Sequence, residues 1–259
     1  MQNSAKNILR VHRKTPNNAC RAELGRYPLI IKIQKRDVKF YNHLKGSDSQ
    51  TFHNKAITYR EMNLEKSPLS KLVLGLCSQT QTDPTEPQDS NTIRPNQIMR
   101  KQKDNYLTHW KELTKKQSKL ECYLALNREY TVAEYLTTVT DPNLRKALTM
   151  YRLSEHSLAI EKGRRRQTWL SREDRLCAHC PQNEVETELH FLTSCQMYDH
   201  IRDTYFPQIT QTHKEFENKP NFDKLPYLLG EIPQCAITAA RFVTCCHKKR
   251  ATSEEQTPL

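Results

Sequence analysis

The chain has 259 residues, with 41 Lys and Arg against 29 Asp and Glu, and therefore a net charge of +12. Its five glycines are few for this length, and neither G-x-G-x-x-G nor the P-loop motif occurs, which argues against Rossmann and P-loop nucleotide-binding folds. No apolar stretch reaches the ~20 residues that span a bilayer, and no apolar secretory segment follows Met1. We therefore expect an intracellular protein, nuclear or cytoplasmic, with no membrane partner.

The low apolar content predicts a mostly helical fold. Hydrophobic residues make up 36% of the chain and its mean hydropathy is −0.84, which favours a modest core and long charged helices over a dense sheet. The predicted fold class is mostly α, with helical segments around a small CCHC zinc-binding module. A polyanionic partner such as nucleic acid would offset the surplus positive charge. The alternative is a basic protein without such a partner.

Residues 1–77 are predicted to form a basic helical segment. One helix is expected after Pro28, because apolar residues follow it at near-helical spacing: Ile30, Ile33, Val38, Tyr41 and Leu44. A second helix is expected over 52–64. Residues 78–95 are polar and interrupted by prolines, so they are the predicted linker.

Residues 96–160 are predicted to be a helical region. One long amphipathic helix, or two, should cover 96–126, with Tyr106, Trp110 and Leu113 on one face and lysines outside. That lysine face is either simply solvated or a track for phosphates. Thr131 and Glu134 have the spacing of a capping box, and Asp141-Pro142 is typical of a helix start. The helix after Pro142 has an apolar face, and residues 157–160 could form a strand.

The remaining segments are a zinc-binding module at 161–206, a C-terminal helical segment at 207–247 and a disordered tail at 248–259. Tyr198, Ile201 and Tyr205 have the spacing of one helix, and another is expected from Pro233 to about Thr244.

The strongest motif is a group of potential metal ligands. Cys177-Ala-His-Cys180 is followed after nine residues by His190, and after four more by Cys195. Zinc prefers four tetrahedral thiolate and imidazole ligands, and a complete set of four protein ligands implies a structural Zn²⁺. His179 lies inside the C-x-x-C turn, where its ring should point away. The alternative is a set of buried or unrelated thiols.

The other cysteines are predicted to be structural. Cys235, Cys245 and Cys246 lie near His247, but adjacent cysteines rarely ligate one zinc, and the flanking residues are apolar. A second metal site is thus the less favoured reading. Cys20, Cys77 and Cys122 are isolated.

Basic residues flank the zinc motif and are the candidate nucleic-acid-binding set: Lys162, Arg164, Arg165, Arg166, Arg172 and Arg175. The planar guanidinium matches phosphate oxygens and also stacks on bases, and Trp169 adds an aromatic ring nearby. The alternative is an exposed basic turn paired with Glu161, Glu173 and Asp174.

Catalytic motifs are absent from the sequence. It contains no Asp-Asp pair, no H-E-x-x-H and no G-x-S-x-G, and the zinc deaminase signature is missing. We expect no enzyme activity, no catalytic residues and no small-molecule substrate.

Four segments resemble the reverse-transcriptase zinc-binding domain found after the polymerase in non-LTR (LINE-type) retrotransposons, especially those of fish: Ile160-Glu-Lys-Gly-Arg164, Arg172-Glu-Asp-Arg-Leu-Cys-Ala-His-Cys180, Glu184-Val-Glu-Thr-Glu-Leu-His-Phe-Leu192 and Cys195-Gln-Met-Tyr198. The resemblance covers residues 145–206, and more loosely most of the chain. It implies zinc ligands at Cys177, Cys180, His190 and Cys195. It also implies element RNA or target DNA as ligand, and a polymerase body as a possible partner.

The chain lacks the polymerase and endonuclease residues of such elements, so it is expected to be a C-terminal accessory region. Two alternatives remain. One is a zinc-stabilised docking module that uses the Trp110 face and the Ile30–Leu44 helix. The other is a transposon relic without function.

Overall fold

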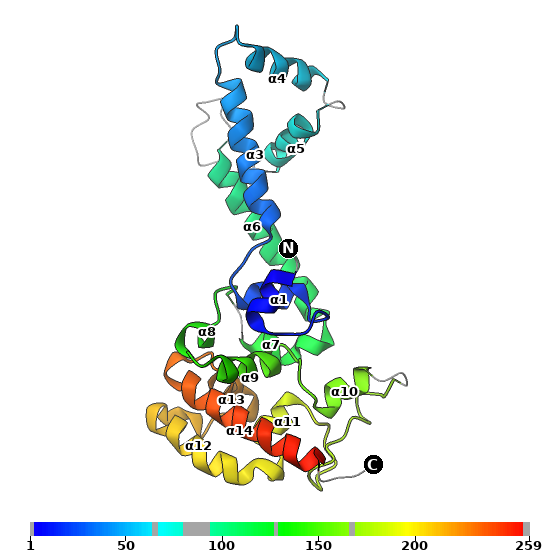
Figure 1. Cartoon of the computed structure of the whole chain (residues 1–259), viewed down its shortest axis with the longest axis vertical. Coiled ribbons are helices and arrows are strands. Elements are labelled where there is room, and N and C mark those ends of the chain that lie inside the picture. The colour runs from blue at the N-terminus through cyan, green and yellow to red at the C-terminus, as the bar shows by residue number, and fades with distance from the viewer. Residues whose placement is uncertain (1–2, 64–66, 80–93, 127–128, 166–168, 256–259) are drawn as a thin grey trace. The chain divides into compact units, whose positions relative to one another are not determined.

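The structure is a computed structural model that describes residues 3–63, 67–79, 94–126, 129–165 and 169–255. Within these ranges the chain is mostly helical, as predicted, and the only β-type pairings are two isolated antiparallel bridges. The chain divides into two compact units (Figure 1). Unit 1 comprises residues 1–26 and 112–259, and unit 2 comprises residues 27–111. No described helix is both long and apolar enough to cross a membrane.

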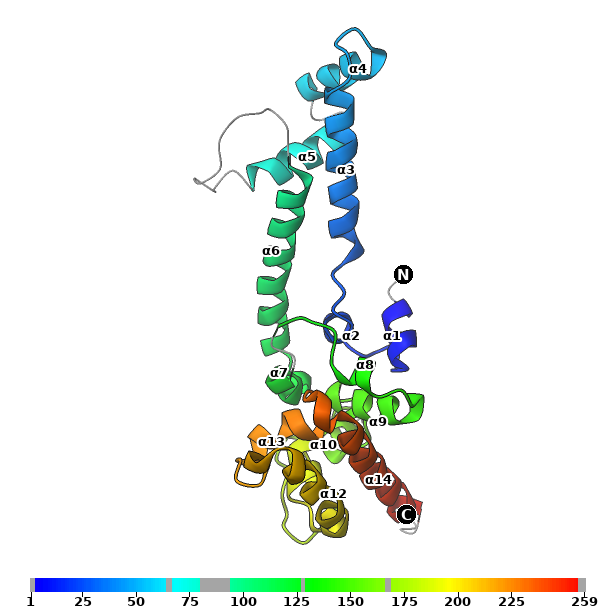
Figure 2. The same cartoon turned by 90° about the vertical axis from the view of Figure 1, so that its left-hand side faces the viewer.

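Unit 2 is a small helical body around one core. Its helices are α3 (Leu29–Lys45), α4 (Phe52–Met62), α5 (Pro68–Ser78) and most of α6 (Pro95–Lys115). The hydroxyls of Thr51 and Ser67 cap α4 and α5 by accepting a backbone N–H three residues on, which fixes where those helices begin. Figures 1 and 2 show α4 and α5 beside one end of α3. The core residues are Val38, Tyr41, Ile57, Val73, Leu76 and Ile98.

The predicted helix after Pro28 is confirmed, but its predicted buried face is partly wrong. Ile30 and Ile33 are 53% and 43% exposed, whereas Ile31, Val38 and Tyr41 are buried. Apolar residues occur on two sides of this helix, so periodicity alone does not determine which side meets α4 and α5.

Unit 1 contains most of the helices. They are α1 (Asn3–Leu9), α2 (Asn17–Glu23), η2 (Ser118–Leu120), α7 (Glu121–Leu126), α8 (Tyr135–Thr138), α9 (Pro142–Arg152), α10 (Ala159–Arg165), α11 (Glu188–Thr193), η3 (Gln196–Tyr198), α12 (Asp199–Thr212), η4 (Lys214–Phe216), α13 (Asn221–Leu228), η5 (Pro233–Cys235) and α14 (Ala236–Glu255).

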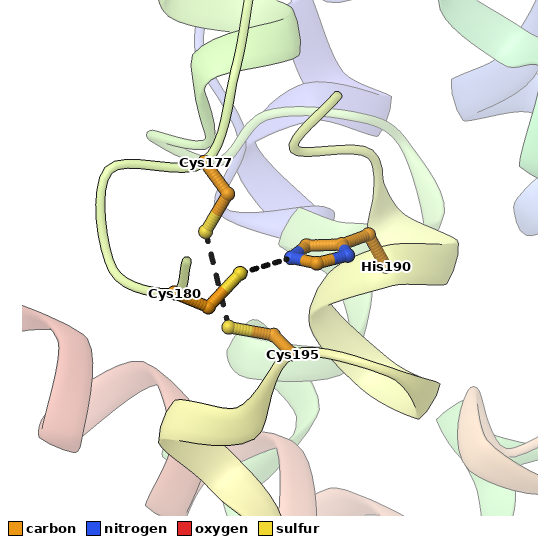
Figure 3. A group of neighbouring side chains, drawn as sticks. All are labelled: Cys177, Cys180, His190 and Cys195. Carbon is orange, nitrogen blue, oxygen red and sulfur yellow. Dashed lines mark hydrogen bonds between the residues drawn. The ribbon is translucent and has the colours of Figure 1, made fainter. Parts of the chain in front are cut away.

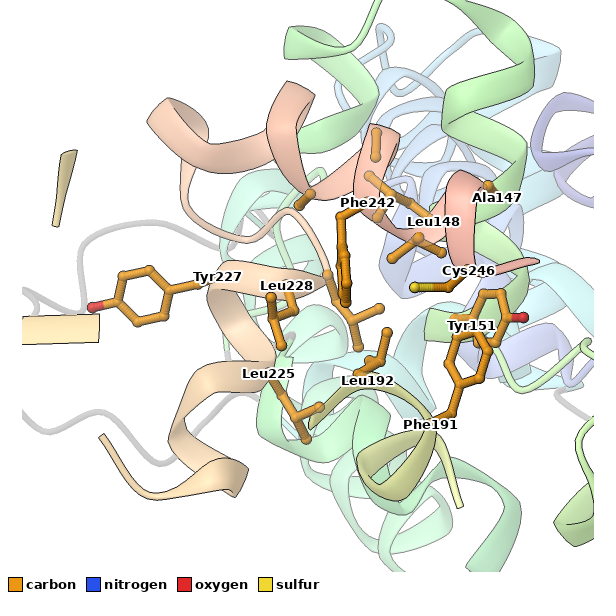
Figure 4. Close-up of a cluster of buried hydrophobic side chains, with 14 of the residues drawn as sticks. Ala147, Leu148, Tyr151, Phe191, Leu192, Leu225, Tyr227, Leu228, Phe242 and Cys246 are labelled. Atoms are coloured by element: carbon orange, nitrogen blue, oxygen red, sulfur yellow. The ribbon is translucent and has the colours of Figure 1, made fainter. Parts of the chain in front are cut away.

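The core of unit 1 forms around α14, which packs against α9, α12 and α13. Figure 4 shows Phe242 and Cys246 of α14 meeting Leu148 and Tyr151 of α9. Side chains from α11 and α13 complete this cluster: Phe191, Leu192, Leu225 and Leu228. Each fully buried side chain of this size contributes about 1.5–3 kcal/mol, so α11, which carries His190, is anchored by the core.

The local helix signals had mixed outcomes. Asp141 caps α9 as predicted, since its carboxylate accepts from the N–H groups of Asn143 and Leu144 at 2.7 and 3.4 Å. The predicted capping box does not form, because α8 begins after Glu134 without a side-chain cap. The strand expected at 157–160 is also wrong, because α10 begins at Ala159.

The predicted boundaries of the N-terminal segment differ from those of the two units. Residues 1–26 belong with 112–259, not with the rest of 1–77. A buried ion pair explains part of this association, because the Arg152 guanidinium of α9 bonds both carboxylate oxygens of Glu23 in α2, and neither side chain is exposed. Most of the predicted linker, residues 80–93, lies outside the described residues.

The tail predicted to be disordered from 248 is largely helical. Helix α14 continues to Glu255, well past the predicted end near Thr244, and residues 256–259 lie outside the described ranges. The reason is Arg250, which is buried and forms an ion pair with Glu186. The polar C-terminal end of the chain is therefore held in the fold by the ion pair between Arg250 and Glu186.

Candidate metal centre and its basic surroundings

A short hairpin-like turn positions the first two cysteines. Leu176 and Val185 form an antiparallel bridge, the Cys177 N–H donates to the Glu184 carbonyl at 2.8 Å, and the Glu186 N–H donates to the Arg175 carbonyl at 2.9 Å. These bonds hold the two arms of the turn together.

Helix α11 and its end supply the other two candidate ligands. Thr187 caps this helix by accepting the N–H of His190 at 3.1 Å, which fixes the turn that carries the imidazole. After the helix, the Cys195 N–H donates to the carbonyl of His190 at 2.9 Å. The prediction that a short helix and its terminal turn would present this pair is confirmed.

The four side chains converge on one point (Figure 3). One potential ligand atom from each of Cys177, Cys180, His190 and Cys195 lies within 4.8 Å of all the others. The sulfurs of Cys177 and Cys195 are 3.8 Å apart, and the Cys180 sulfur is 3.4 Å from Nε2 of His190. A tetrahedral ion with metal–sulfur bonds of ~2.3 Å and metal–nitrogen bonds of ~2.0 Å gives edges of about 3.8 and 3.5 Å. The group could therefore hold a metal ion.

A carboxylate orients the imidazole. Nδ1 of His190 lies 2.8 Å from Oε2 of Glu184, and because a carboxylate only accepts, Nδ1 carries the proton. Nε2 is then left with its lone pair towards the three sulfurs. This outer contact is typical of metal-ligating histidines and was not predicted from the sequence.

The thiols themselves are tuned by burial and by one another. The hydrogen bond with Cys195 and burial together raise the pKa of Cys177 to about 12, and the same hydrogen bond lowers the pKa of Cys195. Because metal ligation requires thiolates, binding of an ion here would release protons.

Cys235 and Cys246 are buried in the core of unit 1, as predicted, and Cys245 is partly buried against it. In the described part of the chain, the four residues above are the one group of potential metal ligands found. His179 points away from the cluster, with Nδ1 3.2 Å from the hydroxyl of Ser253.

Two acidic residues just before His190 are bonded to distant parts of unit 1. Glu186 pairs with Arg250, and Glu188 accepts from Ser154 at 2.7 Å and contacts His156 at 2.8 Å. Although burial opposes it, the contact with His156 and the hydrogen bonds lower the pKa of Glu188 to about 2. The metal-binding turn and α11 are thus fixed to α14 and to the segment after α9 by groups far away in sequence.

Three of the predicted nucleic-acid-binding residues reach the surface. Lys162 is exposed on α10. Arg164 is half-buried, 3.0 Å from a Glu161 oxygen and bonded to the Ser118 hydroxyl at 2.8 Å. Arg172 is 42% exposed and pairs with Glu121 at 2.8 Å. The predicted pairing of this turn with Glu161 is therefore present for Arg164.

Arg175 requires a correction. Its side chain is only 4% exposed, and its guanidinium donates to the carbonyls of Leu170 and Ile160. These internal acceptors occupy the donors that a phosphate would need, so Arg175 is a structural residue here. The side chain of Arg165 and all of Arg166 lie outside the described residues.

A small cavity of about 150 Å³ lies beside Arg164 and Arg172. Its charged lining residues are balanced in sign: Lys119, Arg164 and Arg172 against Glu121, Glu161 and Glu188. The cavity itself therefore has no net attraction for a phosphate. Comparison of the chain with protein-family models, with curated proteins and with solved structures found no match.

Proposed function

We propose that this chain is a nucleic-acid-binding accessory region of a retrotransposon reverse transcriptase, built around a structural zinc ion and without catalysis of its own. Single-stranded RNA is the expected ligand, with target DNA as the related possibility. The observation that carries the proposal is the convergence of Cys177, Cys180, His190 and Cys195, in a chain of net charge +12. The retrotransposon context rests on the resemblance of residues 145–206.

Zinc is the ion that this donor set favours. Three thiolates and one imidazole are soft to borderline ligands that suit zinc better than magnesium or calcium. Four protein ligands complete a tetrahedron, so no position remains for an activated water, and the ion would act as a clamp.

Charge supports nucleic acid as the partner. The chain carries a net +12, and the exposed cations Lys162 and Arg172 shortly precede the metal-binding motif in the sequence. The pair between Arg172 and Glu121 is exposed, and pairs of this kind contribute only ~0–1 kcal/mol, so a phosphate can replace the carboxylate.

Metal analysis tests the clamp. Purified protein should contain one equivalent of zinc, and Cys180→Ser should lose it together with the fold of the module, because the metal free energy is folding free energy. Cys77→Ser is the matched control, since Cys77 lies in unit 2 outside the cluster, and it should retain the metal. Full zinc in Cys180→Ser would refute the ligand set.

Salt dependence tests the partner. Affinity for single-stranded RNA should fall steeply with salt, with a slope of ~0.7 per phosphate contacted. The double variant Lys162→Gln, Arg172→Gln removes two phosphate contacts and should reduce that slope by ~1.4. A double change of equal charge at exposed lysines elsewhere in unit 1, Lys146→Gln with Lys214→Gln, should leave it unchanged. Salt-independent binding would contradict electrostatic recognition.

One observation favours docking as a second function. Leu29, Ile30 and Phe40 on α3 are exposed apolar side chains, which suits a protein contact. The Trp110 side of the predicted docking surface is not available, because Trp110 is 2% exposed. If neutralising Lys162 and Arg172 leaves RNA binding intact, docking becomes the better account.

A further inference from the structure

Trp169 is an exposed aromatic side chain that lies between the exposed cations Lys162 and Arg172 in the sequence. It is 70% exposed, whereas the other tryptophan of the chain, Trp110, is buried. A large indole left in water forgoes the hydrophobic stabilisation that burial gives elsewhere in this protein. Its exposure leaves most of the ring available to a partner.

A buried arginine holds this indole in place. The guanidinium carbon of Arg175 lies 5.7 Å from the centre of the Trp169 ring. The same guanidinium donates to the Leu170 carbonyl at 3.2 and 2.7 Å and to the Ile160 carbonyl at 3.1 Å. It thus links α10 to the residue that follows Trp169 and fixes the backbone next to the ring.

Gly163 makes room for this arginine. A Cβ at position 163 would lie 2.7 Å from Cγ of Arg175 and 2.8 Å from its Cδ and Nε, closer than side-chain contacts allow. A residue with a side chain at position 163 would therefore displace the Arg175 side chain. Gly163 thus allows Arg175 to lie where it contacts the Trp169 ring.

The charges around the ring indicate the kind of partner. Lys162 on α10 is exposed, and the side chain of Arg172, three residues after Trp169, is 42% exposed. Cations in the segments on either side of the ring disfavour a basic or purely apolar protein surface as the partner. Phosphates beside an aromatic base match both features, because cations bind the backbone while the indole stacks on the base.

We propose that Trp169 stacks on an unpaired base of single-stranded nucleic acid, and that Arg175, buried behind the ring, is its positioning residue. The inference rests on the proposed nucleic-acid-binding function and adds the contact that selects single strands. In a duplex each base is already stacked between its neighbours, so no base offers a free face on which the indole can stack.

Substitution of the ring tests the proposal on the full chain with zinc bound. Stacking is worth ~1–3 kcal/mol per base, so Trp169→Ala should weaken binding of a single-stranded oligouridylate about 5- to 150-fold. The salt slope should stay the same, because no phosphate contact is lost, and Trp169→Phe should restore most of the affinity. Phe52→Ala, which removes an aromatic ring of similar exposure in unit 2, should have no effect.

Fluorescence gives a second readout. The oligouridylate should quench the tryptophan emission of the wild type but not that of Trp169→Phe, because the remaining emitter, Trp110, is buried. Gly163→Ala should weaken binding with one equivalent of zinc retained, since it displaces Arg175 without touching the metal ligands.

The outcomes separate this inference from the proposed function. Salt-dependent binding that Trp169→Ala leaves unchanged would overturn the stacking contact and leave the proposed function standing. Equal affinity and equal quenching with a duplex would also overturn it. Absence of binding at every salt concentration would remove both.

Discussion

At the scale of single residues, the candidate metal centre depends on groups beyond its four ligands. His190 can present Nε2 to the sulfurs because Glu184 accepts the proton on Nδ1. The Glu184 side chain is 56% exposed, so it is retained in this position by the hydrogen bond more than by packing. Its role is therefore orientation of the imidazole.

Removal of that acceptor should weaken zinc binding without abolishing it. Glu184→Gln keeps the size of the side chain but weakens the hydrogen bond to the Nδ1 proton, and loss of such a contact typically costs ~10–100-fold in metal affinity. Competition with a chromophoric chelator would measure the change. Glu217→Gln, at an exposed glutamate away from the cluster, should bind zinc like the wild type. Equal affinity in both variants would show that the orienting bond is unimportant.

At the scale of elements, the end of α14 fastens the metal-binding turn to the core. Arg250 pairs with Glu186 and donates to the Ser157 carbonyl at 3.3 Å, so it joins the turn to the segment before α10. Both charged side chains are buried, at 4% and 2% exposure. A buried carboxylate that loses its cation is strongly unfavourable.

Truncation of α14 should therefore destabilise unit 1. Deletion from residue 250 onwards leaves Glu186 buried without its partner and should cost about 3–5 kcal/mol in the free energy of unfolding. Chemical denaturation with zinc bound would measure this. Deletion from residue 256 is the control and should change stability by less than ~0.5 kcal/mol. Equal stability of the two truncations would show that the ion pair does not support the fold.

At the scale of the whole molecule, the described residues give each unit a hydrophobic core of its own. The core of unit 1 is formed by residues between 122 and 246, and that of unit 2 by residues between 38 and 98. The candidate metal centre lies entirely in unit 1. Each unit thus has its own set of buried side chains to drive its folding.

Unit 1 should fold and bind zinc without unit 2. A variant in which a flexible Gly/Ser linker replaces residues 27–111 should keep one equivalent of zinc and a single cooperative unfolding transition, because its core loses no buried residue. Circular dichroism with metal analysis would test this. A variant that is unfolded with excess zinc would show that the two units depend on each other.

Short-range patterns in the sequence were sufficient for the candidate metal ligands and for several helices. The four ligands lie within residues 177–195, so a turn and one short helix can bring them together whatever the rest of the chain does. The start of α9 is equally local, because Asp141 caps N–H groups two and three residues away. These predictions needed only spacing and side-chain chemistry.

Only the tertiary structure decided which charged residues are buried and which parts of the chain fold together. In the sequence, nothing distinguishes Arg175 from its neighbour Arg172. In the fold, however, the Arg175 guanidinium donates to backbone carbonyls of Ile160 and Leu170, and residue spacing does not predict these contacts. The partners of Arg152 and Arg250 lie 129 and 64 residues away. Pairs at such separations are created by packing, and periodicity over a few turns carries no information about them.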